Sequence, residues 1–153
     1  MSVGAYCLRS VRTAEPAETA RAAAQRMQAE RVGCLVVTEN DRPVGVVTDR
    51  DIAMYILCED LDPEKERVRD VMQSPAVTVA CDASLTQAVT ALRKATVRRL
   101  VVVDAAGKVA GVFAADDLLR LLATEIADLA DALRVQFANE AQATSTAKGA
   151  SDA

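Results

Sequence analysis

The sequence repeats itself at a spacing of 66 residues, and this feature constrains the fold more than any other. Residues 33–52, GCLVVTENDRPVGVVTDRDI, align without a gap on residues 99–118, RLVVVDAAGKVAGVFAADDL. Gly45 then matches Gly111. A repeat of this kind is one supersecondary unit that cannot bury its apolar face alone. We therefore expect two similar halves that pack against each other.

Each repeat has the pattern of a mixed α+β unit. Apolar residues recur at helical spacing within residues 14–31 and 80–97, where Pro16 and Asp82 are typical of helix starts. A β-branched run follows at residues 35–37 and 100–103, then a polar turn at 39–42 and 105–108 and a second apolar run. These patterns predict strand, helix, strand, strand, helix in each half.

The segments outside this pattern set the expected domain limits. Residues 1–65 hold the first repeat with an N-terminal segment and a linker, and residues 66–127 hold the second repeat. The segment from residue 58 to residue 73, which joins the repeats, is highly charged at its start and is expected to be a surface linker. The last helix extends over residues 128–140, and residues 141–153 are expected to be a disordered tail. A heptad-like seam along this helix favours association into a homodimer, although it could instead close the module's own core. The seam consists of Leu119, Leu122, Ile126, Leu129 and Leu133.

Composition excludes several classes of function. The chain has no histidine, which makes triad and zinc chemistry improbable, and its four cysteines show no C-x-x-C spacing. With 22 acidic against 18 basic residues and 3% aromatic residues, nucleic acid is not an expected partner. No apolar run approaches the length of a membrane span, so we expect a cytoplasmic protein without a membrane partner.

Four segments, in their order and repetition, resemble the CBS (cystathionine-β-synthase) domain family. They are VGCLVV at 32–37, VGVVTDRDI at 44–52, VRDVM at 68–72 and VRRLVVVD at 97–104, and the resemblance covers residues 8–126. It implies a pseudo-two-fold pair of β-α-β-β-α units that usually dimerises. It also implies a cleft for an adenosyl compound, such as AMP, ADP, ATP, NAD or S-adenosylmethionine, and a signal passed to a partner protein. No catalysis and no catalytic cofactor are implied.

Thr48 and Asp51 are the leading candidates for ligand contact. They stand where a strand gives way to a helix, and a helix N-terminus favours phosphate while the carboxylate can accept from ribose hydroxyls. The same residues also fit a capping box, and the two roles are compatible. Resemblance to the family adds Arg98 and Arg99 for the phosphates, although they could equally be the solvated end of a strand.

The remaining candidates are assigned less directly. Arg50 could reach phosphate or pair with a neighbouring acid. Walls around the adenine are expected from Val11 to Thr13 and from Val32 through Gly33 to Cys34, and Cys34 also fits simple packing. The second repeat retains Asp117, but Ala114 stands there in place of Thr48. In the first repeat, Val32-Gly33 stands at the place of the arginine pair. One good site is therefore expected, and two remain possible.

The sequence leaves two functions open. The first is a non-enzymatic sensor that binds an adenine nucleotide, AMP before NAD or ATP, and signals to an effector protein that the sequence does not identify. The second is a ligand-independent dimerisation or scaffold module. A measurement of nucleotide binding distinguishes the two functions, because only the sensor binds a ligand.

Overall fold

The computed structural model describes residues 2–7 and 10–151, and of residues 138–151 the backbone alone. The chain forms two compact units, a body that ends at Ala115 and a helical unit that begins at Asp116. Within the body, two three-stranded sheets of the same design confirm the predicted pair of repeats and the mixed α+β class.

Each sheet combines one parallel and one antiparallel pairing. The first contains β1 (Thr13–Ala14), β2 (Cys34–Glu39) and β3 (Arg42–Thr48), in the order β1-β2-β3. The second contains β4 (Thr78–Ala80), β5 (Arg99–Val103) and β6 (Val109–Ala114), in the order β4-β5-β6. In both sheets the first strand is parallel to the central strand and the third is antiparallel to it.

The helices that cover these sheets begin later than the sequence suggests. Helix α1 (Ala20–Glu30) is capped by Thr19, and α4 (Leu85–Ala95) is capped by Ser84. Both hydroxyls accept a backbone N–H of the first turn, which explains why they, and not Pro16 and Asp82, define the helix starts. The predicted second helix follows each hairpin directly, as α2 (Asp49–Cys58) and α5 (Ala115–Ser151).

The hairpin turns differ by one residue, which shifts the alignment of the two repeats. Thr38 pairs with Pro43 across the first turn, and Val103 pairs with Val109 across the second. Thr38 and Val103 are 65 residues apart, whereas Pro43 and Val109 are 66 apart. The gapless alignment at 66 is therefore correct after the turn and wrong by one residue before it.

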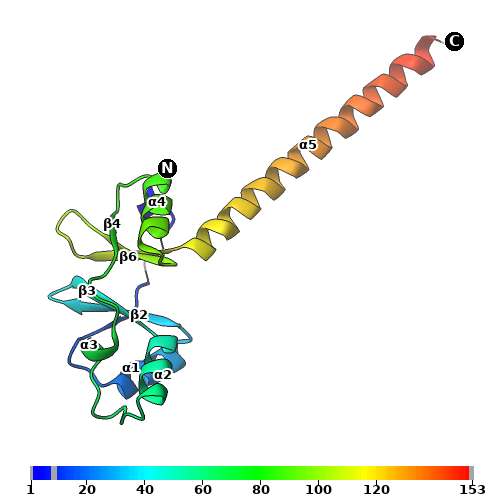
Figure 1. Cartoon of the computed structure of the whole chain (residues 1–153). Helices are drawn as coiled ribbons and strands as arrows, with labels where there is room; N and C mark the ends of the chain where they lie inside the picture. The colour runs from blue at the N-terminus through cyan, green and yellow to red at the C-terminus, as the bar shows by residue number, and fades with distance from the viewer. Residues whose placement is uncertain (1, 8–9, 152–153) are drawn as a thin grey trace. The chain divides into compact units, whose positions relative to one another are not determined.

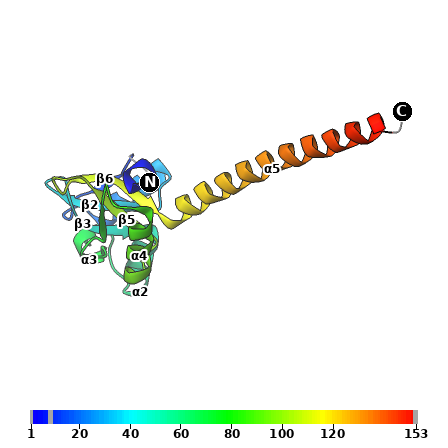
Figure 2. The same cartoon turned by 90° about the horizontal axis from the view of Figure 1, so that it is seen from above.

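The central strands are buried on both faces. Leu35 and Val37 point toward the helices and belong to a buried cluster with residues of α1 and α2. Val36 points the other way because side chains alternate along a strand, yet it is only 1% exposed. Figure 1 shows the second sheet on that side, and in the view from above the strands of the two sheets overlap (Figure 2). The two sheets thus cover each other's inner faces.

The two repeats also exchange short helical segments. Val68, at the start of α3 (Val68–Val71), is fully buried in the core of the first repeat, and its N–H donates to Glu18 O at 2.9 Å. Val3, in the 3-10 helix η1 (Val3–Ala5), is likewise buried and donates to Ala83 O of the second repeat at 2.8 Å. The end of the predicted surface linker is therefore part of a core.

A contact between the hairpin tips joins the repeats a second time. The N–H of Val109 donates to Asp41 O at 3.0 Å, and Lys108 Nζ lies 2.9 Å from Asp41 Oδ2. The hydrogen bond from Lys108 and its charge lower the pKa of Asp41. Both side chains are exposed, so the ion pair adds little to the stability of this contact.

Helix α5 carries the predicted seam on its surface. The five seam residues are 43–68% exposed. The backbone continues as helix to Ser151, through most of the range assigned to a disordered tail. The side chains of residues 138–151 lie outside the described part of the chain. The domain limits given above stay predictions. None of the described helices is both long enough and apolar enough to cross a membrane.

Truncating the exchanged segment tests its place in the core. We expect Val68→Ala to lower the free energy of unfolding by roughly 2 kcal/mol, because it removes buried methyl groups and leaves a cavity. Val89→Ala, at a position that is 43% exposed, is the matched control and should change stability by less than about 0.5 kcal/mol. Urea denaturation measures both, and equal losses would contradict the burial of Val68.

Candidate functional site

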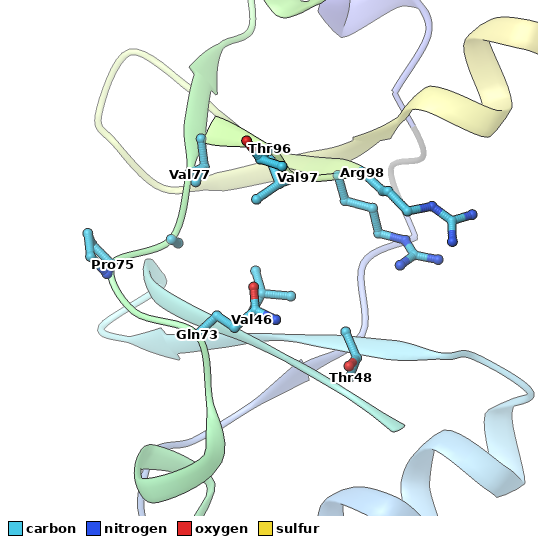
Figure 3. Close-up of a pocket in the computed structure, with 10 residues that line it drawn as sticks. Val46, Thr48, Gln73, Pro75, Val77, Thr96, Val97 and Arg98 are labelled. Atoms are coloured by element: carbon cyan, nitrogen blue, oxygen red, sulfur yellow. The ribbon is translucent and has the colours of Figure 1, made fainter. Parts of the chain in front are cut away.

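An open cleft of about 260 Å³ lies where the two repeats meet. This volume is slightly below the roughly 300–1,000 Å³ of typical small-molecule pockets, so a nucleotide-sized ligand would remain partly exposed. In Figure 3, Thr48 lies on one side of the cleft and Arg98 on the other. The lining comes from the end of β3, the segment before β4 and the segment before β5: Val46, Thr48, Gln73, Pro75, Ala76, Val77, Thr96, Val97, Arg98 and Arg99.

The first side of the cleft ends in a capping box at the start of α2. Thr48 has an extended backbone, and its hydroxyl accepts the N–H of Asp51 at 3.1 Å. In return, Asp51 Oδ2 accepts the backbone N–H of Thr48 at 3.0 Å and the Thr48 hydroxyl at 2.7 Å. The capping role predicted for this pair is thus present. Asp51 is not among the residues that line the cleft, but its carboxylate is hydrogen-bonded to Thr48 and Gln73, which do line it.

Gln73 also contacts this carboxylate, and this contact was not predicted from the sequence. Its backbone forms an antiparallel bridge with Val46, and its side-chain amide donates from Nε2 to Asp51 Oδ1 at 3.0 Å. Nothing in the local sequence indicates this contact, because it depends on how the linker pairs with β3. Residue Gln73 lies on the same side of the cleft as Val46 in Figure 3.

The opposite side carries the predicted arginine pair. Arg98 is exposed and Arg99 is half-buried, and both line the cleft. Arg99 also lies near the thiol of Cys34: burial raises the pKa of Cys34, Arg99 opposes that rise, and Asp49 adds to it. Cys34 is therefore held as a neutral thiol that packs at the start of β2. The pair of guanidinium groups makes this side of the cleft electropositive.

The predicted adenine walls lie elsewhere. Val11 and Thr13 line a separate depression with residues of the hairpin tips, and Val32, Gly33 and Cys34 are not among the lining residues of the cleft. Before the hairpin turn the two repeats are offset by 65 residues, so residues 11–13 and 32–34 correspond to residues 76–78 and 97–99 of the second repeat. These two segments of the second repeat do contribute lining residues to the cleft. The residues predicted to enclose the adenine therefore do not line this cleft, and most of their equivalents in the second repeat do.

The last two candidates are Arg50 and Asp117. Arg50 is exposed in the first turn of α2, and Asp117 stands in the first turn of α5, within the helical unit. Neither is among the residues that line the cleft. In the described residues the structure contains no group of three acidic or cysteine side chains that could hold a metal ion.

The pseudo-symmetric positions have a different chemistry. Ala114 stands where the cleft has Thr48, so the hydroxyl is missing. Gly33 and Cys34 stand where the cleft has Arg98 and Arg99. The two halves share a backbone design, but the hydroxyl of the first half and the cations of the second meet at this cleft, and the pseudo-symmetric positions have neither.

Comparison with known proteins agrees with this architecture. The family model of the CBS domain matches residues 3–58 and 68–124. A CBS domain protein from Pyrobaculum aerophilum, solved in complex with AMP, is 28% identical with a TM-score of 0.72 over 84% of this chain and 99% of that chain. A CBS domain protein from Thermoplasma acidophilum is 26% identical with a TM-score of 0.71, over 78% of this chain and 68% of that one.

Curated relatives are mostly longer than the matched region. An uncharacterised protein from Methanopyrus kandleri is 34% identical over 122 residues, which is 79% of this chain and 62% of the relative. A second, from Methanocaldococcus jannaschii, is 30% identical over 80% of this chain but only 40% of its own length. This chain therefore spans less than two thirds of these relatives. On the family match and the paired sheets, the chain belongs to the CBS domain family and contains two CBS domains in tandem.

Proposed function

We propose that this CBS pair is a regulatory module that binds an adenine nucleotide in the cleft between its repeats and signals its occupancy to a partner protein. The observation that carries the proposal is the joint lining of one open cleft by Thr48, Arg98 and Arg99, with the Asp51 carboxylate held at its edge. A hydroxyl, a carboxylate and two cations match the ribose and phosphate of a nucleotide in chemical type.

The cleft offers a complementary surface for each part of such a ligand. The Asp51 carboxylate, which Thr48 holds in place, would accept both ribose hydroxyls, and the guanidinium groups of Arg98 and Arg99 would bind phosphate oxygens. The half-buried side chains of Val77 and Val97 would pack on the adenine ring. Hydrogen bonds to charged groups of this kind contribute roughly 1.5–3 kcal/mol each, so they dominate the expected affinity.

AMP is the preferred ligand, with ATP and NAD as further candidates. The similar protein from Pyrobaculum aerophilum was solved with AMP, which supports this choice. The two arginines on one side of the cleft favour a phosphorylated ligand over S-adenosylmethionine. The pseudo-symmetric positions lack the hydroxyl and the arginines, which supports one site per chain. We assign no catalytic role to the cleft, and the effector protein and the cytoplasmic location stay predictions.

A dimerisation or scaffold role is the second candidate, and the surface of α5 favours it. Leu119, Ile126 and Leu133 follow a seven-residue spacing, with Leu122 and Leu129 between them, and all five are exposed. Burying the exposed halves of ten such side chains would contribute about 10 kcal/mol. Association itself costs roughly 4–15 kcal/mol. The gain from burial therefore offsets this cost only if all five seam residues of each copy are buried. We propose that it pairs with the same helix of a second copy.

Removing the cation pair separates phosphate recognition from nucleoside recognition. We expect Arg98→Ala with Arg99→Ala to weaken AMP binding at least about tenfold and adenosine binding less than about threefold, because only AMP presents a phosphate. Isothermal titration calorimetry measures both ligands. For the intact protein, AMP at a hundred times its Kd should add about 2.7 kcal/mol to the free energy of unfolding.

The matched control removes the same charge elsewhere. Arg93 and Lys94 are exposed in the last turn of α4 and do not line the cleft. Arg93→Ala with Lys94→Ala should leave AMP affinity within about twofold of the intact protein at 0.15 M salt, where distant charges are screened. Equal losses of AMP and adenosine in the Arg98/Arg99 variant would remove the phosphate role. No binding of any adenine nucleotide would favour the scaffold.

A charge placed in the seam tests the dimer. We expect Ile126→Asp to convert a dimer into a monomer, because it buries a carboxylate between two apolar helix faces. Thr124→Asp, on the opposite face of the same helix, is the control and should remain dimeric. Size-exclusion chromatography with light scattering gives the molar mass of both. A dimer that persists in Ile126→Asp would show that the copies associate through another surface.

A further inference from the structure

We propose that the side-chain amide of Gln73 takes the place of a ribose hydroxyl on the Asp51 carboxylate in the ligand-free protein, and that a nucleotide with a ribose diol must displace this amide to bind. This inference rests on the proposed function, because it concerns the same carboxylate. It makes Gln73 a residue that sets both the affinity of the site and its preference for ligands with ribose hydroxyls.

The acceptor capacity of Asp51 is the first argument. A carboxylate offers about four acceptor positions. Three are already filled, by the N–H and the hydroxyl of Thr48 on Oδ2 and by the amide of Gln73 on Oδ1. Two ribose hydroxyls need two positions, and only about one is left. The contacts of Thr48 hold the helix cap, so the amide of Gln73 is the contact that gives way.

The second argument is that Gln73 can move its side chain without moving its backbone. Its N–H donates to Val46 O at 2.8 Å, and its carbonyl accepts the N–H of Val46 at 3.0 Å. These bonds fix the main chain beside β3. The side chain is exposed and lines the cleft, so rotation about its own bonds is enough to carry the amide into solvent.

The chemistry of the displaced group defines the selectivity. The Gln73 amide donates to Oδ1 at 3.0 Å, which is an ordinary length for a hydrogen bond from nitrogen to oxygen. A ribose hydroxyl replaces this donor with another donor, so the carboxylate stays satisfied in both states. A ligand without ribose hydroxyls displaces nothing and gains nothing at this position. Gln73 thus competes only with ligands that carry the ribose diol.

Truncation of Gln73 tests the inference by calorimetry with three ligands. We expect Gln73→Ala to bind AMP and adenosine about three- to tenfold more tightly, since the competing hydrogen bond is gone. Binding of 2′,3′-dideoxyadenosine monophosphate should stay unchanged. Ser74→Ala is the matched control: its hydroxyl donates to Val44 O and not to the carboxylate, so AMP affinity should remain that of the intact protein.

Combining Gln73→Ala with Asp51→Asn distinguishes the failure of this inference from the failure of the proposed function. The inference predicts that Asp51→Asn weakens AMP and that Gln73→Ala gives no gain in that background. If Asp51→Asn weakens AMP but Gln73→Ala leaves it equal or weaker, the displacement idea is wrong and the nucleotide site stands. If Asp51→Asn leaves AMP unaffected, or neither the intact protein nor Gln73→Ala binds any adenine ligand, the proposed site itself fails.

Discussion

Burial of both faces of each central strand is the constraint on which the rest of the structure depends. Val36 and Val101 are each 1% exposed although they point away from the helices of their own repeats. A three-stranded sheet with helices on one side cannot cover these side chains, so each repeat requires the other. Exchange of η1 and α3 and the contact between the hairpin tips strengthen the same arrangement. The cleft forms at the edge of this contact, where β3 ends and β5 begins.

Much of the fold could be predicted from the sequence because the repeat encodes it twice. The β-branched runs, the polar turns and the helices after them appear in both halves, so each prediction is supported by a second copy. The details that failed depend on tertiary structure. Thr19 and Ser84 cap their helices, and only the backbone geometry distinguishes them from neighbouring residues that are equally good helix starts.

The candidate site was predicted in part, for a reason that the strand register makes clear. Thr48 and the arginine pair line one cleft, and the sequence could anticipate this since they lie beside strand ends that the repeat locates. The predicted wall residues do not line the cleft, because its apolar side comes from the repeat opposite Thr48 and because a turn that is one residue longer shifts the equivalence of the repeats. Gln73 could not be foreseen, since its contact with Asp51 arises from a bridge between the linker and β3.

The central claim is that an adenine nucleotide binds in this cleft with its ribose at the start of α2. A crystal structure of the protein grown with AMP tests it most directly. The account predicts both ribose hydroxyls within about 3 Å of the Asp51 carboxylate, the phosphate beside Arg98 and Arg99, and the amide of Gln73 turned away. AMP bound at another place, or an empty cleft at saturating AMP with Gln73 still on the carboxylate, would contradict it.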